Sequence, residues 1–403
     1  MDVGKERTVQ TVMTAPSSLL NLDDAAALAA ADTDGALRSA ALAGAQVRAT
    51  YAAVEEFVSE RLGDLRPRSV VFVAGEGRAG RAASMLIAAV GARIGFPLVH
   101  AATTPLWVGP LDVVVLSGHD AGDPRLAEST SAAVRRGAET VLVTPDEGPL
   151  RSAAAGRAVF LPPRVAVREH NTLMRYLAAG TAVLAAVSDG AYRSVLPDLS
   201  GIADLLDAEA ARNHPSHEVF HNPAKSLAAQ ISGSRVVLSG GGAVDVELAR
   251  HGSEVLLRAA GVVAGAGELS DVVAAVVSSA RTSGAAPVEY DAFFHDDEFD
   301  GPRPEQAIRV VVLTSDSLAA SAERRTAALP DSVVITAGLP EIDRGSIDFG
   351  SPANSVVGAG GYRREGRDGA GTNPHSAGEL GATAVLATRL EMAAAYLQLM
   401  GGK

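Results

Sequence analysis

The segment GEGRAGR, residues 75–81, directly follows the apolar run SVVFVA and is the first stretch of the chain with a chemical signature. Its glycines Gly75, Gly77 and Gly80 match the G-x-G-x-x-G spacing of a turn that leads a strand into a helix beside a phosphate group. The free amides at such a helix N-terminus favour an anion. The spacing is consistent with a dinucleotide site, with a site for another anion, or with a tight turn of structural importance only.

A dinucleotide site needs an acidic residue about 20 positions further on, at the end of the second strand, to bind the ribose hydroxyls. The second predicted strand is FPLVH, which ends at His100, and no Asp or Glu occurs between Gly77 and Leu111. Arginine replaces the acid in NADP sites, but Arg93 falls within the predicted helix. We therefore expect no nicotinamide or flavin cofactor and interpret the turn as an anion site.

The composition argues against several classes of function. The chain has 403 residues, a formal net charge of −12 and no cysteine. The negative charge argues against nucleic-acid and anionic-membrane partners, and the lack of cysteine removes disulfides, thiolate catalysis and cysteine-based metal sites. The N-terminus has no apolar signal-peptide core, and the purest apolar stretch, residues 178–187, is too short to span a bilayer. We expect a soluble, cytoplasmic protein.

Strand and helix patterns alternate along the first half of the chain, which is typical of a parallel sheet covered by helices on both faces. An amphipathic helix is predicted over residues 33–62. Short apolar strands and a long apolar helix then follow, at residues 69–74, 112–117, 139–144, 157–162 and 172–187. The fold class is therefore α/β, with a doubly wound, mainly parallel sheet.

The same order recurs downstream, in SRVVLSGGG (234–242), RVVVLTSDS (309–317) and DSVVIT (331–336). Two similar α/β halves are the economical interpretation. We expect N-terminal helices and a first domain over 1–195, a helical linker over 196–221, and a second domain over 222–403. That second domain contains a Gly/Ser/Arg/Asp-rich loop, 338–378, whose composition fits either a mobile lid or a disordered segment, before a final helix over 379–400.

Four segments resemble sugar isomerase (SIS) domains, in particular those of the bifunctional phosphoglucose/phosphomannose isomerase family. They are NPAKSLA (222–228), LPPRVAVREHNTLMRYL (161–177), VVLSGGGAVDVELARHGSEVLLRAA (236–260) and FFHDDEFDG (293–301). The resemblance implies two SIS-type domains and an aldose–ketose isomerase of glucose, mannose and fructose 6-phosphates that works through an enediol. It further implies a homodimer and a reaction that needs neither a metal nor an organic cofactor.

The resemblance places the catalytic carboxylate on Glu254 and the catalytic histidine on His295. A carboxylate can move a proton between C1 and C2, histidine can open the sugar ring near neutral pH, and Arg164 would stabilise the enediolate. Plainer roles remain open for all three. Glu254 lies at helical spacing from neighbouring charged residues in a pattern typical of a solvated salt-bridge ladder, His295 follows two phenylalanines in an acidic loop, and Arg164 could pair with a surface acid.

At the phosphate end the sequence departs from that family. Ala79 stands where the family has a phosphate-binding serine, and SGHDAGDPR (117–125) keeps only Ser117 of a hydroxyl-rich loop. We expect Gly75, Gly77, Arg78, Ser117 and His119 to bind the phosphate, with Arg78 and Arg81 replacing the lost hydroxyls. The alternative is a catalytically degenerate protein that binds a sugar phosphate as a sensor or regulatory partner, because carboxylates in the second loop repel phosphate. The C-terminal Lys403 is a doubtful substitute for the family's C-terminal lysine.

A metal site is the remaining alternative. His214, His217 and His221 lie close together, and the last two have the i, i+4 spacing of a helical metal-binding pair. Pro215 disturbs the start of that helix, and no recognised metal motif completes the set. We therefore expect no metal.

Overall fold

The computed structural model describes residues 20–282, 308–339 and 374–401. Its first sheet has five parallel strands in the order β2-β1-β3-β4-β5. They are β1 (Ser69–Val73), β2 (Leu98–Ala101), β3 (Asp112–Ser117), β4 (Glu139–Val143) and β5 (Val159–Phe160). Ligands of such doubly wound sheets bind where the strand order reverses, at the carboxyl ends of the strands. In this sheet that place lies beyond β1 and β3.

Alternate side chains of these strands enter two different cores, as the two-residue period of a strand requires. Val70 and Phe72 face the helices α3 (Ala43–Phe57), α5 (Arg78–Val90) and α8 (Leu173–Val187). Val71 and Val73 face the side covered by α6 (Pro124–Arg135) and α7 (Gly148–Ala154). The sheet is buried on both faces, which explains its nearly continuous apolar strands.

The second sheet repeats this topology with four parallel strands in the order β7-β6-β8-β9. They are β6 (Arg235–Gly240), β7 (Ala264–Glu268), β8 (Ile308–Leu313) and β9 (Ser332–Ile335). Helix α12 (Ala243–Ala260) covers one face, while α13 (Leu269–Thr282) and α14 (Ala319–Thr326) cover the other. The predicted fold class, α/β with two parallel sheets and helices packed on them, is confirmed.

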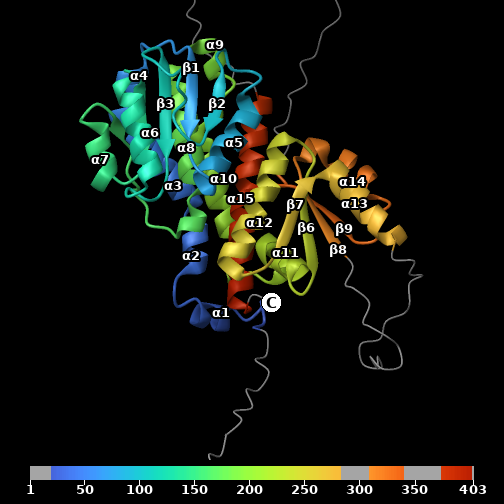
Figure 1. Cartoon of the computed structure of the whole chain (residues 1–403). Helices are drawn as coiled ribbons and strands as arrows, with labels where there is room; N and C mark the ends of the chain where they lie inside the picture. Colours follow the sequence, from blue (N-terminus) through green and yellow to red (C-terminus); the bar gives the residue numbers. More distant parts are fainter. Residues whose placement is uncertain (1–19, 283–307, 340–373, 402–403) are drawn as a thin grey trace, which may run out of the picture.

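Helix α15 (Pro374–Leu399) runs between the two sheets (Figure 1). It packs against α12, α11 (Pro223–Ile231), α10 (Leu199–Arg212) and α2 (Ala36–Ala41), so it contacts elements from both halves of the chain. Nearly every side chain from 380 to 397 is buried, which explains why the helix has no polar stripe. Helix α10, within the predicted linker 196–221, packs against α3 as well as α15.

Two local predictions differ from the structure. The helix predicted over 33–62 is three helices, α2, α3 and α4 (Ser59–Leu62). Helices α2 and α3 are separate because the Leu42 amide donates to the Ser39 carbonyl three residues back instead of continuing the α-helical ladder. Strand β7 was not predicted, since its sequence AGAGE has low strand propensity and its place is set by pairing with β6. The remaining short elements are α1 (Ala25–Ala31), η1 (Glu169–Asn171), α9 (Gly190–Arg193), η2 (Val219–His221) and η3 (Asp316–Leu318).

Among the residues that the structure describes, no helix combines the length and the apolar character that a membrane crossing requires.

Candidate functional site

The glycine loop after β1 makes a close turn into α5. Gly77 is the N-cap of α5 and has a φ of 90°, a conformation that favours glycine. A Cβ atom on Gly80 would lie 2.1 Å from the carbonyl oxygen of Gly75, so the loop and the first turn of the helix can approach only without a side chain there. No side chain among the described residues caps this helix. Its N-terminal amides are therefore free to bind an anion.

At the two corresponding helix starts a carboxylate of the chain itself accepts a hydrogen bond from a backbone amide. Asp123, the N-cap of α6, accepts a hydrogen bond from the Arg125 amide at 2.8 Å. Asp245, in the first turn of α12, accepts hydrogen bonds from the Gly242 amide at 3.2 Å and from the Thr314 hydroxyl at 3.1 Å. Each carboxylate places a negative charge at a helix start, where it would repel an external anion. Neither α5 nor α12 has a side-chain cap, but the turn at α5 is open in a further sense: among the described residues no carboxylate bonds its backbone amides.

Asp245 is almost fully buried, and its titration reflects that burial. Burial raises its pKa to about 6, against the opposing effect of the hydrogen bonds from Thr314 and the Gly242 amide. Desolvation disfavours the charged carboxylate more than those hydrogen bonds favour it. The loop of the second sheet thus contains the carboxyl group of Asp245, whose ionised form would repel a bound phosphate.

Arg78 is the first residue of α5 and brings a largely buried positive charge to the open loop. Its side chain is 11% exposed, and its Nε and Nη1 atoms are buried without a hydrogen-bond partner in the described part of the chain. The carboxylate of Glu169 lies 3.8 Å from Nε, which is an ion pair without a hydrogen bond. Buried guanidinium nitrogens normally find acceptors. Arg78 therefore has unused donors, and the exposed Glu76 in the loop is the opposing charge nearby in sequence.

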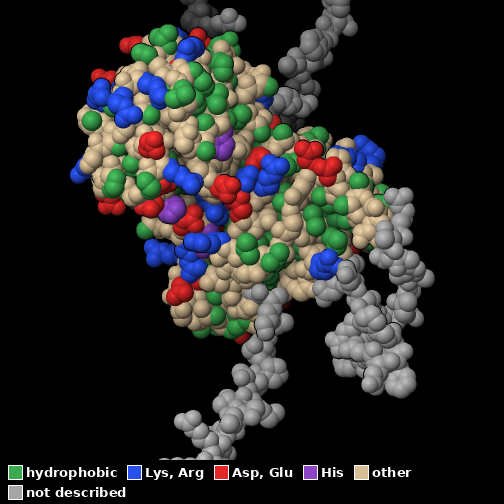
Figure 2. Space-filling model, in the orientation of Figure 1, with side chains coloured by type: hydrophobic (Ala, Val, Ile, Leu, Met, Phe, Trp, Pro, Cys, Tyr) green, Lys and Arg blue, Asp and Glu red, His purple; other side chains and the backbone are tan. Residues whose placement is uncertain are grey.

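Arg81, one turn further along α5, joins the two halves of the chain. Its guanidinium donates to Glu254 at 2.5 Å and to Glu247, both on α12. Burial opposes the charged form of Arg81, but these two carboxylates raise its pKa above the ordinary value. The second oxygen of Glu254 is buried and has no hydrogen-bond partner among the described residues. Acidic and basic side chains intermix where the two halves meet (Figure 2).

A buried polar network holds η1, and with it Glu169, against both halves. Asn171 donates to one oxygen of Glu391 on α15 at 2.9 Å. The other oxygen of Glu391 lies 3.1 Å from Nε2 of His251 on α12. Burial lowers the pKa of the adjacent His170. The segment that carries Glu169 is thus fixed by side chains from distant parts of the sequence.

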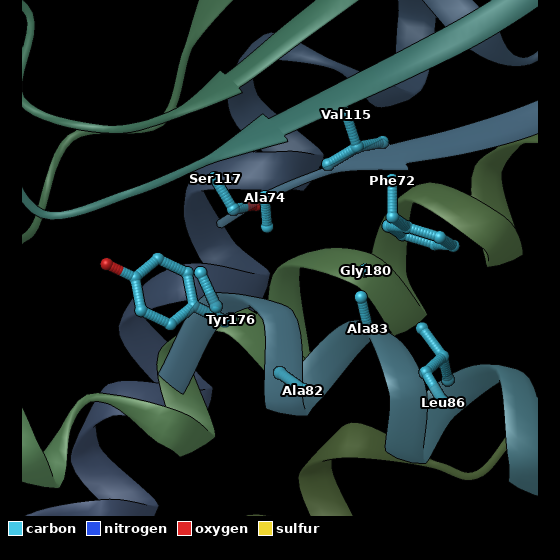
Figure 3. A pocket seen from close by; sticks show the side chains of 10 residues that line it. Phe72, Ala74, Ala82, Ala83, Leu86, Val115, Ser117, Tyr176 and Gly180 are labelled. Carbon is cyan, nitrogen blue, oxygen red and sulfur yellow. The ribbon is translucent and has the colours of Figure 1, made fainter. Parts of the chain in front are cut away.

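Ser117, Tyr176 and Ala74 line a small cavity (Figure 3), and Ala79 of the glycine loop lines it too. Its volume is about 10 Å³, which is close to the minimum for one water molecule. It is too small for a sugar. His119 is exposed in the loop that follows β3.

The structure brings some of the predicted site residues together and not others. Glu254 and Arg78 lie on the facing helices α12 and α5. Arg164, in contrast, donates to Glu56 at 2.6 Å and lies over the ring of Phe57, so its described contacts are on α3. His295 and nearly all of the 338–378 loop lie outside the described residues.

The histidine cluster near residue 217 makes local hydrogen bonds. His214 bonds the Ser216 hydroxyl, and His217 bonds the carbonyl of Arg212. Within the described residues no group of three or more His, Asp or Glu side chains is placed to hold a metal ion.

The sequence did not indicate three features of the site: Asp245, Glu169 and the pairing of Arg81 with Glu247 and Glu254. Asp245 could have been found, because it follows SGGG at the third position of a predicted helix, where an acid commonly caps. The contacts of Glu169 and Arg81 involve residues far apart in sequence, and no local pattern indicates them.

No protein-family model matches the chain, and no curated protein sequence matches it either. Solved structures with the same arrangement do exist. A candidate phosphosugar isomerase of Silicibacter pomeroyi aligns with a TM-score of 0.53 at 15% identity, over 91% of this chain and 95% of that one. The tagatose-6-phosphate ketose/aldose isomerase of Escherichia coli aligns with a TM-score of 0.52 at 13% identity, over 91% and 90%.

A third similar structure is the C-terminal domain of glucosamine-fructose-6-phosphate aminotransferase from Francisella tularensis, with a TM-score of 0.50 at 9% identity, over 89% and 94%. At such identities the likeness concerns the fold. The chain has the tandem SIS-like fold of these proteins, with both sheets included in the aligned length.

Proposed function

We propose that this chain binds a phosphorylated sugar at the N-terminus of α5 and interconverts its aldose and ketose forms. The observation that carries the proposal is the open glycine loop: α5 has no side-chain cap, while Arg78 beside it has buried, unpartnered donors in the described part of the chain. Backbone amides at a helix start together with a guanidinium suit a phosphate dianion. At the starts of α6 and α12 a phosphate would instead meet the carboxylates of Asp123 and Asp245, each of which accepts a hydrogen bond from a backbone amide there.

The tandem SIS-like fold supports a sugar phosphate over other anions. Two of the similar structures are named for phosphosugar or tagatose 6-phosphate isomerisation, and the third for glucosamine-fructose-6-phosphate aminotransferase. In this proposal the substrates are hexose 6-phosphates, with glucose, mannose, fructose and tagatose 6-phosphates as the first candidates. The phosphate would lie at α5 and the sugar would extend toward α12.

Glu254 is the proposed base. Its carboxylate would remove the proton from C2 of the aldose to give the enediol and return it to C1 of the ketose, so that the reaction needs no external reductant. Because Arg81 contacts Glu254, we assign to Arg81 the stabilisation of the enediolate that the sequence suggested for Arg164. His295 keeps its proposed role in ring opening.

A second candidate function is binding without turnover, as a sensor or regulatory protein. The observation that favours it is the engagement of Glu254: one oxygen bonds Arg81 and the other is buried. A base in this arrangement requires movement of Arg81 or of α12 before it can reach a substrate. A homodimer and a cytoplasmic location are further parts of the proposal.

A coupled isomerase assay on the four hexose 6-phosphates, combined with thermal-shift titration, tests these functions. An isomerase gives turnover that falls at least about 100-fold in E254Q, with the exposed-residue variant E60Q as the matched control. Ligand-induced stabilisation without turnover establishes the binding function instead. If there is neither turnover nor stabilisation, both functions are refuted.

A further inference from the structure

A groove opens beside α5, on the side of the helix that faces β2 and the start of α12. Its volume is about 450 Å³, within the range of small-molecule sites. Leu98 and Val99 of β2 and Ile87 of α5 form apolar walls. Ser84, His100 and Glu247 supply polar groups along the same groove. An apolar cavity with a few convergent polar groups is the usual form of a ligand site.

The imidazole of His100 has two hydrogen-bonding neighbours. Its Nε2 lies 3.3 Å from the carbonyl oxygen of Ala74, which can only accept, so Nε2 carries a proton. Its Nδ1 lies 3.2 Å from the Ser84 hydroxyl. In the neutral ring Nδ1 is therefore an acceptor for that hydroxyl. The pair presents one oxygen and one imidazole that can exchange hydrogen bonds with a hydroxylated ligand.

The groove continues from the open glycine loop. Arg78, Arg81, Ser84 and Ala88 follow one another at intervals of three or four residues, so they form one stripe along α5. The rise of an α-helix separates Arg78 from Ser84 by about 9 Å, a distance comparable to the length of a six-carbon phosphate ester. Moreover, Ala74 bonds His100 and immediately precedes the loop.

Glu247 marks the far wall of the groove and belongs to the other half of the chain. Its carboxylate is held by Arg81 and Arg250, so it is already charge-compensated. Carboxylate oxygens accept hydrogen bonds from hydroxyl groups. A ligand in the groove would thus contact both halves.

We propose that this groove binds the hydroxyl-bearing carbon chain of the sugar, with Ser84, His100 and Glu247 reading its hydroxyl groups while its phosphate lies at α5. The proposal rests on the proposed function and assigns the sugar end of the same site. Ser84 and His100 are proposed as binding residues, distinct from the phosphate contacts of Arg78.

Isothermal titration with two ligands separates the sugar end from the phosphate end. The probes are fructose 6-phosphate and inorganic phosphate, each titrated into the full chain. Wild-type protein is expected to bind the sugar phosphate more tightly than phosphate. S84A and H100N are each expected to weaken fructose 6-phosphate binding about tenfold and to leave phosphate binding within about twofold. A88W, which fills the groove, is expected to act in the same way.

The control H221N replaces an exposed histidine outside the groove and is expected to leave both affinities unchanged. R78Q, in contrast, is expected to weaken both ligands alike. If S84A, H100N and A88W all retain wild-type affinity for fructose 6-phosphate, the groove proposal is wrong even though the proposed function stands. The same conclusion follows if they weaken both ligands equally. If wild-type protein binds neither ligand, the proposed function fails, and the assignment of the groove is overturned with it.

Discussion

Replacing Asp245 by asparagine removes the buried acid that closes the loop of the second sheet. The pKa of this carboxyl is about 6 in the folded chain, against an ordinary value of 3.8. The folded state therefore holds the proton more tightly than the unfolded state, and ionisation of Asp245 costs folding free energy. The difference of roughly two pKa units corresponds to about 3 kcal/mol once the group is fully ionised.

The sign of the pH dependence follows from the raised pKa. Below pH 3.8 Asp245 is protonated in both states and the cost is absent; it grows between pH 3.8 and 6 and is complete above pH 6. The asparagine of the D245N variant does not titrate, and its side-chain oxygen can still accept from the Gly242 amide. The free energy of unfolding of D245N, relative to wild type, should rise by about 3 kcal/mol between pH 4 and pH 7.5.

Urea unfolding followed by circular dichroism at several pH values measures this difference. Any constant offset between the two proteins reports lost or changed hydrogen bonds and cancels in the comparison. D24N is a suitable control, because Asp24 is an exposed N-cap and accepts a backbone amide in a comparable way. A difference between D245N and wild type that stays constant with pH, or that falls as pH rises, would refute the assignment of a raised pKa to Asp245.

Three further predictions concern the glycine loop and the contact between the halves. G80A places a Cβ against the Gly75 carbonyl, and should reduce phosphate affinity at least about tenfold in isothermal titration while circular dichroism is unchanged; unaltered affinity would contradict the anion site. R81M removes the ion-pair partner of Glu254 and one of the two partners of Glu247, and should lower the free energy of unfolding by roughly 3 kcal/mol. R48M, which breaks exposed ion pairs, should lower it much less in the same urea titration. E254Q, the test of the proposed base, should leave fructose 6-phosphate affinity within about threefold of wild type, because the phosphate contacts remain; a larger loss would mean that Glu254 binds substrate in addition to any catalytic role.

The strands were predictable where burial on both faces dictates the residue types. The sequence run DVVVLS coincides with β3, and all of its valines are buried. The sequence AGAGE of β7 carries no such signal, because its place depends on pairing with β6 through backbone hydrogen bonds that any residue can make. The open loop before α5 was also predictable, since the glycine spacing is a local requirement of the turn itself.

The charge pairs of the site were not predictable in the same way. Glu254 was recognised as a charged residue on a helix face, which leaves its partner undefined. Its partner Arg81 lies 173 positions earlier in the sequence, and only the packing of α5 on α12 brings them together. For Arg164, a local Pro-Pro-Arg sequence suggested a site residue and left a surface ion pair as the alternative, and the side chain pairs with Glu56. Local motifs identify backbone geometry, whereas long-range ion pairs depend on the tertiary fold.

The structure gives a role to the acidic residues that stand in place of the expected phosphate-binding hydroxyls: their carboxylates bond backbone amides. In the loop after β3, Asp120 accepts a hydrogen bond from the Gly122 amide, and Asp123 accepts one from the Arg125 amide. These carboxylates therefore bond backbone amides that would be available to a bound anion in a hydroxyl-rich loop. Asp245 does the same in the second sheet. The third equivalent turn differs, because no carboxylate bonds its backbone amides among the described residues. The buried Nε and Nη1 atoms of Arg78, which have no hydrogen-bond partner in the described part of the chain, cost folding free energy unless an anion satisfies them. The loss of hydroxyls in one loop is therefore compatible with a retained anion site in the other.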